Sequence, residues 1–206
     1  MTARAGGTDL PTTVGSVRLP NPIMTASGTS GHGAELADHF DLADLGAVVV
    51  KSLHPDPWDG NPPPRVHATP AGMINSVGLQ GPGVSAWLEE DLPALVASGA
   101  RVVASIWGRT VDEFARAASL LADAPSQVVA VEVNASCPNL EDRRRLFAHS
   151  ATATAEVVEA AAVANRPRWA KLSPNTYDLP EVAGAAAAAG AEAVTVANTV
   201  LGMGID

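Results

Sequence analysis

The stretch Val128–Asn134 reads Val-Val-Ala-Val-Glu-Val-Asn, a mostly apolar, β-branched run that ends in a polar side chain. Short runs of this kind are typical of strands that are buried on both faces of a sheet. The pattern recurs at Ala47–Val50, Arg101–Ile106, Trp169–Ala170 and Ala193–Ala197, and a brief further strand is expected at Pro22–Thr25. The sequence therefore predicts a sheet of about six strands, mostly without solvent-facing positions.

Helical patterns occupy the intervals between these runs. Apolar residues recur at a spacing of three and four in Val84–Ala97, Val111–Ala122, Thr152–Ala164 and Leu179–Ala189. Alternation of strands and helices is the signature of a parallel sheet. Four of the runs end directly before polar residues, namely Lys51, Asn134, Lys171 and Asn198. All strand ends converge on one face of a TIM (β/α)8 barrel but only some of them do so in a doubly wound sheet, so the α/β barrel is favoured.

The chain is short for a complete barrel of this type. A typical barrel has eight strands and about 250 residues, whereas this sequence has 206 residues. We therefore expect a TIM barrel that is truncated after about six strands. The expected organisation is a flexible leader at residues 1–13, followed by a single barrel domain at residues 14–206 that is incomplete at its C-terminus.

Composition and charge restrict the classes of function. The formal net charge is −9, which argues against a nucleic-acid-binding protein. The longest apolar run, Val182–Ala191, is too short to span a bilayer. The five histidines show no metal-ligand spacing with one another or with the single cysteine, so no metal site is expected. One cysteine is compatible with a reducing compartment, and we expect a cytoplasmic protein.

The single cysteine, Cys137, follows the decisive strand in the loop Asn134-Ala135-Ser136-Cys137-Pro138-Asn139. A lone thiol cannot form an internal disulfide, so it is either a small buried hydrophobic group or a reactive one. Pro138 prevents the chain from continuing as a helix or a central strand. Two flanking carboxamides would be costly to bury without partners, which favours a reactive thiol in a polar site.

Six motifs occur in an order that resembles the dihydroorotate dehydrogenase family over the range from about Val14 to the last residue. They are Ala26-Ser27-Gly28, Val50-Lys51-Ser52, Asn75-Ser76-Val77-Gly78-Leu79, Asn134–Asn139, Ala170-Lys171-Leu172-Ser173-Pro174 and Asn198-Thr199-Val200-Leu201-Gly202-Met203. The cysteine resembles the soluble class 1 enzymes, since the membrane-associated class is expected to carry serine there. Gly60-Asn61-Pro62 and the Asn-Thr-x-x-Gly-Met segment are most similar to class 1B.

The resemblance implies FMN-dependent oxidation of dihydroorotate to orotate in de novo pyrimidine (UMP) biosynthesis. In that chemistry Cys137 is the general base that takes the C5 proton, and a hydride passes from C6 to N5 of FMN. The implied substrate-binding residues are Lys51, Asn75, Gly78, Leu79, Asn134, Asn139, Asn198 and Thr199. The implied FMN-binding residues are Ser27, Lys51, Ser52, Ser105, Asn134, Lys171 and Ala197.

Some positions depart from the family pattern. Ser105 and Gly81 stand where an asparagine is expected, and Trp107 is bulkier than the usual residue. The family binds the FMN phosphate with loops after strands seven and eight, which are not found in this sequence. A dihydropyrimidine dehydrogenase-like flavin domain and a non-catalytic truncated remnant stay open as alternatives. A homodimer and an iron–sulfur/FAD electron-transfer subunit stay open as partners, and the sequence does not specify the electron acceptor.

Overall fold

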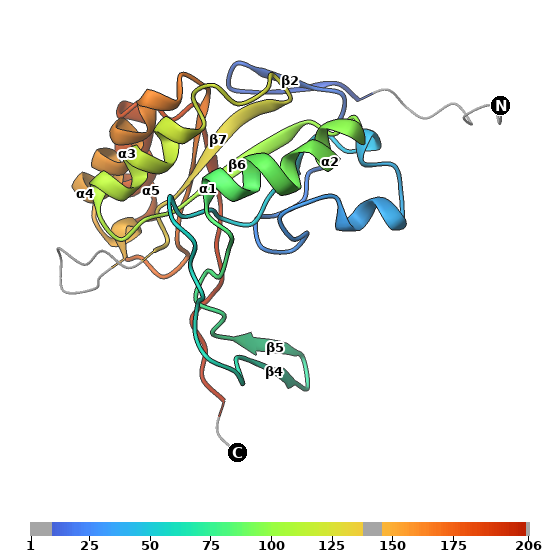
Figure 1. Cartoon of the computed structure of the whole chain (residues 1–206). Helices are drawn as coiled ribbons and strands as arrows, with labels where there is room; N and C mark the ends of the chain where they lie inside the picture. The colour runs from blue at the N-terminus through green and yellow to red at the C-terminus, as the bar shows by residue number, and fades with distance from the viewer. Residues whose placement is uncertain (1–9, 138–145, 205–206) are drawn as a thin grey trace.

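A computed structural model describes residues 10–137 and 146–204 of the chain (Figure 1). Its centre is a five-stranded parallel sheet in which the strand order follows the chain order. The strands are β3 (Val48–Val49), β6 (Val102–Ile106), β7 (Val128–Asn134), β8 (Arg168–Lys171) and β9 (Ala193–Thr195). The five predicted runs are therefore confirmed as strands of one parallel sheet.

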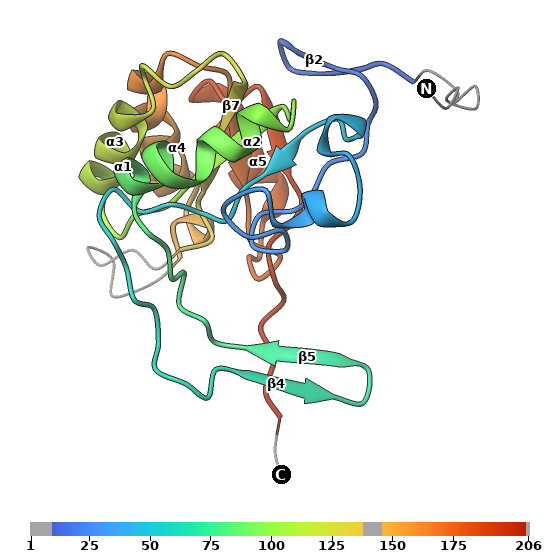
Figure 2. The same cartoon turned by 45° about the vertical axis from the view of Figure 1, so that its right-hand side comes forward.

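Helices cover one face of this sheet, which curls around its other face (Figures 1 and 2). They are α1 (Val84–Ala86), α2 (Leu92–Ala97), α3 (Val111–Leu120), α4 (Ala151–Ala160) and α5 (Leu179–Ala188). Shorter 3-10 turns lie at Glu35–Asp38, Leu42–Asp44, Phe147–His149 and Ala161–Ala164. A doubly wound sheet carries helices on both faces, so sequential strand order with one helical face defines a half-barrel instead. None of the helices in the described ranges is long and apolar enough to cross a membrane.

The helix expected at Val84–Ala97 is divided by a π-helical turn at Trp87–Asp91. Within this turn the N–H of Leu92 donates to the carbonyl of Trp87, five residues earlier. Pro93 follows immediately, and a proline ring clashes with the carbonyl four residues before it in an α-helix. The π turn ends just before this proline, and α2 then begins with Pro93 in its first turn.

Two antiparallel hairpins lie at opposite ends of the sheet (Figures 1 and 2). The first joins β1 (Thr12–Val14) to β2 (Val17–Leu19). The second joins β4 (Val66–Thr69) to β5 (Gly72–Asn75) and was not predicted. The strand expected at Pro22–Thr25 was wrong in extent: only a parallel bridge between Met24 and Ala47 forms, because prolines cannot donate to a ladder.

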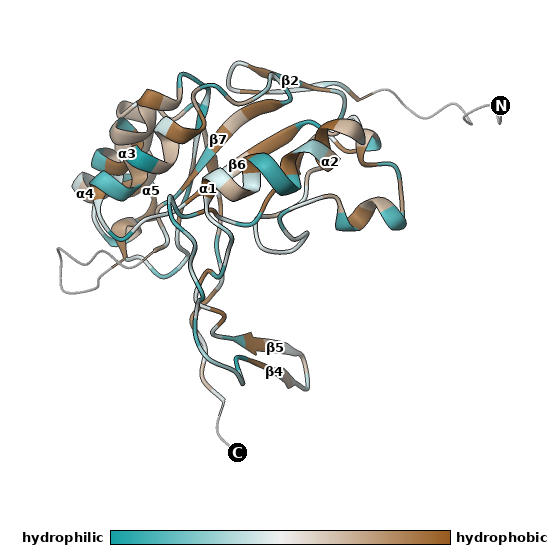
Figure 3. Ribbon diagram, viewed as in Figure 1, coloured by the Kyte–Doolittle hydropathy of each residue, from teal (hydrophilic) through white to brown (hydrophobic). Residues whose placement is uncertain are grey.

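The sheet separates two apolar cores, because successive side chains of a strand point to opposite faces. The outer core lies between the strands and the helices and contains the bulky side chains Trp87, Phe114 and Phe147. The inner core lies on the concave face, where β2 packs against Val49, Val103 and Trp169. Figure 3 shows the apolar residues concentrated on the strands and on the inner sides of the helices.

The inner face changes character along the strands. On β7 the inward positions run from Ala130 through Glu132 to Asn134, while Val131 and Val133 belong to the outer core. On β8 the inward residue Trp169 is followed by Lys171 at the strand end. The apolar part lies beside the first hairpin and the polar part faces the second, so polar side chains gather at the carboxyl ends of the strands.

Candidate active site

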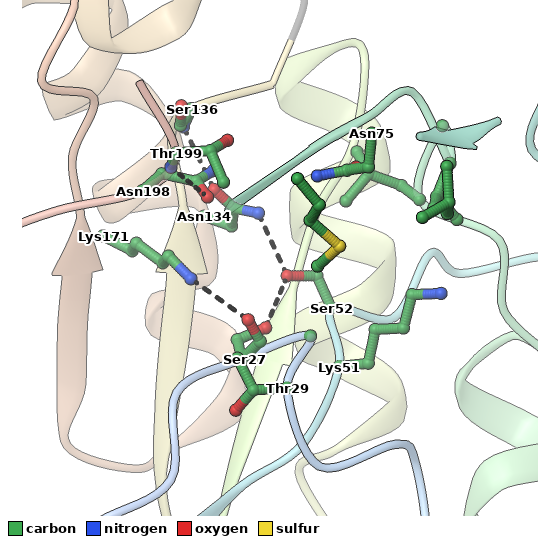
Figure 4. Close-up of a pocket in the computed structure, with 16 residues that line it drawn as sticks. Ser27, Thr29, Lys51, Ser52, Asn75, Asn134, Ser136, Lys171, Asn198 and Thr199 are labelled. Carbon is green, nitrogen blue, oxygen red and sulfur yellow. Dashed lines mark hydrogen bonds between the residues drawn. The ribbon is translucent and has the colours of Figure 1, made fainter. Parts of the chain in front are cut away.

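The polar strand ends surround a cleft of ≈ 400 Å³ that the second hairpin borders (Figure 4). Most of the predicted site residues line it: Ser27, Lys51, Ser52, Asn75, Gly78, Leu79, Asn134, Lys171, Asn198 and Thr199. Gly28, Thr29, Val66, Met73, Val77 and Ser136 also line it and were not among the predicted site residues. The apolar lining residues come from the second hairpin and from the loop after it. The sequence did not indicate that the two strands of this hairpin pair.

Each polar residue is placed by the end of a secondary-structure element. Asn134 and Lys171 are the last residues of β7 and β8, and Asn75 is the last residue of β5. Gly78 and Leu79 follow β5 with φ angles of 75° and 60°. A Cβ at Gly78 would lie 2.8 Å from the backbone nitrogen of Asn61, so only glycine fits this turn.

The hydroxyl of Ser52 is the centre of a hydrogen-bond network on the floor of the cleft. Its Oγ lies 3.1 Å from Ser27 Oγ and 2.9 Å from Ser105 Oγ. Asn134 Nδ2 donates to it over 3.0 Å, as Figure 4 shows. Asn134 Oδ1 in turn accepts from the N–H of Ser136 over 3.2 Å. The side-chain amide of Asn134 is therefore held at both ends.

Glu132 lies beneath this floor and was not predicted as a site residue. Its carboxyl group accepts from Ser105 Oγ over 3.0 Å and from Thr195 Oγ1 over 2.9 Å. The side chain is only 2% exposed. An acidic residue inside an otherwise apolar strand was the signal in the sequence, because glutamate is rarely buried without a specific partner.

Two lysines face the cleft with no ion-pair partner among the residues that the structure describes. Lys171 is 5% exposed, and its Nζ lies 3.5 Å from the carbonyl oxygen of Ser27. Burial, with the positive charge of Arg65 in addition, lowers the pKa of Lys51. Cationic groups held in this way favour a ligand that is anionic or rich in hydrogen-bond acceptors.

Three predicted residues do not line the cleft. Ser105 lies beneath Ser52, and Ala197 lies two residues after the end of β9. Cys137 is fully buried, and its carbonyl accepts from the N–H of Phe147 over 3.1 Å. Burial raises the pKa of the Cys137 thiol, and the charge of Lys171 acts in the opposite direction. Asn139, the remaining predicted site residue, lies outside the described residues.

An aromatic cluster supports the loop that carries Gly78. Trp58 Nε1 donates to the carbonyl of Gly78 over 3.0 Å. The guanidinium carbon of Arg109 lies 4.6 Å from the centre of the Trp58 ring, and the ring of Trp107 is 5.6 Å from it. The His54 ring is 3% exposed and lies 4.8 Å from that of Trp107. These contacts join residues far apart in sequence, and no local pattern indicated them.

Glu113 anchors this cluster, and its ionisation predicts a specific acid sensitivity. Burial opposes ionisation of Glu113, but hydrogen bonds from Arg109 and the charges of Arg109 and His54 lower the pKa from 4.5 to about 2. A carboxyl group whose pKa is lower in the folded state stabilises the fold above its unfolded pKa, and this stability is lost as the pH falls toward 2. We expect Glu113→Gln to lower Tm at pH 7 and to flatten the decline of Tm between pH 4.5 and 2.

Thermal unfolding at a series of pH values tests this expectation. The control is Glu159→Gln, which removes an exposed carboxyl group of α4 and should leave the pH dependence of the parent unchanged. A Glu113→Gln profile that runs parallel to the parent profile would contradict the role of Glu113.

A half-barrel with a polar cleft at its strand ends defines the class of α/β-barrel proteins whose chemistry lies at the carboxyl ends of the strands. Within that class, residues 9–206 match the family model described as dihydroorotate dehydrogenase. The chain belongs to the dihydroorotate dehydrogenase family.

Curated relatives agree with this assignment. The chain is 43% identical over 194 residues to the protein named dihydroorotate dehydrogenase B (NAD(+)), catalytic subunit, of Alkaliphilus oremlandii. It is 48% identical over 194 residues to the protein of the same name from Desulforudis audaxviator, and 41% over 202 residues to that from Geotalea uraniireducens. The alignments cover 94–98% of this chain but 63–66% of those relatives, so the chain spans less than two thirds of their length.

Proposed function

We propose that the chain forms the cleft of an FMN-dependent dihydroorotate dehydrogenase, which oxidises dihydroorotate to orotate in pyrimidine (UMP) biosynthesis. One observation carries the proposal: lysines and carboxamides from four different strand ends meet around one cleft. The family assignment supplies the reaction, and the cleft supplies groups that suit its reactants. The cleft is also large enough for a small aromatic ligand.

The donor set of the cleft fits FMN. A flavin ring carries carbonyl oxygens and ring nitrogens on one edge, and it becomes negatively charged on reduction. Lys171 is nearly buried and without a carboxylate partner in the described part of the chain, so it can stabilise that charge. The further FMN-binding residues that we propose are Lys51, Ser27 and Ser52, which line the cleft, and Ser105 and Ala197, which do not. When bound, FMN accepts the hydride that dihydroorotate loses.

The substrate is held by the remaining residues. Dihydroorotate carries a carboxylate, which the ammonium group of Lys51 can pair with. The carboxamides of Asn75, Asn134 and Asn198 can each present a donor and an acceptor to the alternating N–H and C=O groups of the pyrimidine edge. Gly78, Leu79 and Thr199 border the same space, and Asn139 is proposed as a further carboxamide ligand.

Cys137 is the proposed general base, which takes the proton from C5 of dihydroorotate onto its sulfur. A thiol acts as a base only as the thiolate, and burial disfavours that form here. The positive charge of Lys171 is the group that opposes the effect of burial. We therefore assign Lys171 a second role, which is to stabilise the Cys137 thiolate.

The wider organisation follows from the family. We propose that residues 14–206 belong to a flavin-binding TIM barrel and contribute about six of its strands. The relatives are named catalytic subunits, which supports a partner subunit. An iron–sulfur/FAD subunit that passes electrons to NAD(+) is the partner we propose, together with a cytoplasmic location and a homodimeric catalytic core.

Two substrates that differ by one carboxylate test the proposed function. Dihydrouracil lacks the carboxylate of dihydroorotate but has the same ring. A charge-assisted hydrogen bond contributes about 1.5–3 kcal/mol, so we expect kcat/KM for dihydroorotate to exceed that for dihydrouracil by about 10–100-fold. The FMN-loaded protein is assayed with an artificial electron acceptor. Faster oxidation of dihydrouracil would favour a dihydropyrimidine dehydrogenase-like function, and a protein that binds no FMN would favour a non-catalytic one.

A further inference from the structure

Glu132 is a buried acidic side chain that the proposed chemistry does not use. It lies on the inner face of β7, two residues before Asn134, and it reaches the cleft only through other side chains. We propose that Glu132 is a positioning residue that fixes the orientation of the Asn134 carboxamide. It acts through the hydroxyl groups of Ser105 and Ser52. The proposal rests on the proposed function only for the identity of the ligand that Asn134 meets.

The direction of each hydrogen bond in this network follows from the number of hydrogens that a hydroxyl can donate. A serine hydroxyl has one hydrogen to give and two lone pairs. Ser105 gives its hydrogen to Glu132 Oε1 over 3.0 Å. Its contact of 2.9 Å with Ser52 can then be a hydrogen bond only if Ser52 is the donor. Ser52 therefore donates its only hydrogen to Ser105, which in turn donates to Glu132.

Because Ser52 donates to Ser105, its two other hydrogen-bond partners, Ser27 and Asn134, must both be donors. With its hydrogen used, Ser52 Oγ can only accept from Ser27 and from Asn134, at 3.1 and 3.0 Å. Both of its lone pairs are then occupied. Asn134 must therefore turn its nitrogen toward Ser52, because a carboxamide oxygen there would face a lone pair with no hydrogen between them.

The hydrogen bond at the oxygen of the Asn134 amide supports this orientation. Its Oδ1 lies 3.2 Å from the backbone N–H of Ser136, which can only donate. Asn134 is left with one N–H and one oxygen lone pair for a ligand. Ser27 has given its hydrogen to Ser52, so its Oγ presents only lone pairs to the cleft. The network therefore selects a ligand with an N–H or O–H group opposite Ser27.

Thr195 offers a matched comparison for this network. Its hydroxyl donates to Glu132 Oε2 over 2.9 Å, so it contacts the same carboxyl group as Ser105 does. Thr195 has no contact with Ser52 among the hydrogen bonds of the described residues. Thr195→Val thus removes a hydrogen bond from Glu132 and leaves the path to Asn134 complete, whereas Ser105→Ala interrupts that path.

A double-mutant cycle in the full chain tests the proposal by thermal unfolding at pH 8. Asn134→Asp places an oxygen against Ser52, which has no hydrogen to offer, and should lower Tm. In the Ser105→Ala background the hydrogen of Ser52 is free to turn toward the introduced carboxylate. The loss caused by Asn134→Asp should then be smaller by about 2–4 °C, which corresponds to one recovered hydrogen bond. Thr195→Val removes an equivalent hydrogen bond from Glu132, so an effect that comes from the Glu132 carboxyl group alone would also appear with that variant.

The control cycle uses Thr195→Val, in which Asn134→Asp should lower Tm as much as in the parent. The proposal would be overturned if Asn134→Asp lowered Tm by the same amount in the Ser105→Ala background as in the parent. It would also be overturned if Thr195→Val reduced this loss of Tm as much as Ser105→Ala does. If the proteins that carry Asn134→Asp do not fold, orotate affinity of the FMN-loaded protein decides: Ser105→Ala should weaken it about tenfold and Thr195→Val should not. A parent protein that binds no orotate would contradict the proposed function and leave the unfolding result intact.

Discussion

Cys137→Ala is expected to slow dihydroorotate oxidation by about 10²–10⁴-fold, the range that a general base contributes. The variant should still bind FMN and orotate, because alanine leaves the surrounding backbone contacts in place. The rate of flavin bleaching after rapid mixing with dihydroorotate at pH 7 measures the effect. A variant that bleaches at the parent rate would show that Cys137 is a packing residue.

Cys137→Ser tests the basicity of the side chain while its shape is kept. Serine has nearly the same shape but is a poorer base at neutral pH, so it should keep weak activity that rises with pH. Burial already raises the pKa of the native thiol, so the parent rate should also increase with pH until the thiolate forms. A flat profile for the parent between pH 6 and 10, with the protein still folded, would count against Cys137 as the titrating base.

Lys51→Met is expected to weaken orotate binding by about 10–100-fold, the loss of one charge-assisted hydrogen bond. The same change should raise Tm of the ligand-free protein. Lys51 is partly buried without an ion-pair partner in the described part of the chain, and burial lowers its pKa, so its charge opposes folding. Affinity and stability should therefore change in opposite directions.

Calorimetric titration with orotate and thermal unfolding measure the two effects of Lys51→Met. Lys51→Arg is the control, because it keeps the charge and should not raise Tm. A Lys51→Met protein with parental affinity would remove Lys51 from the site. A Lys51→Met protein with lower Tm would show that the lysine stabilises the fold through contacts other than charge.

The parallel sheet could be predicted because each strand carries its own signal. The apolar residues of β6 and β7 are buried on both faces, so their sequence is apolar almost without interruption. The second hairpin has no such signal. Val66 and Met73 are exposed on it, and a hairpin that stands away from the body leaves no burial pattern in the sequence. The brief strand from Pro22 was overestimated because its apolar residues suggest a strand, whereas the proline has no N–H to donate to a ladder.

Site residues at or after the end of a strand could be predicted from the sequence. A residue whose role depends on hydrogen bonds to neighbouring strands could not. Lys51, Asn134 and Lys171 could be found from their positions after apolar runs, and they line one cleft. Glu132 was counted as part of an apolar run, since its partners Ser105 and Thr195 lie on other strands. Cys137 is fully buried, and its carbonyl accepts a hydrogen bond from Phe147, ten residues later, a contact that no local pattern describes.

Along the inner face of β7 and β8, apolar residues give way to polar residues toward the carboxyl ends of the strands. This order bears on which positions can vary during evolution. On β7 and β8 the inward residues near the first hairpin belong to the inner core, and the last inward residue of each strand lines the cleft. Substitutions at Asn134 or Lys171 change the lining of the cleft, whereas substitutions at Ala130 or Trp169 change the inner core. Residues of the inner core and residues of the cleft occupy different segments of the same strands, so the two groups can vary separately where the hydrogen bonds of the cleft floor are kept.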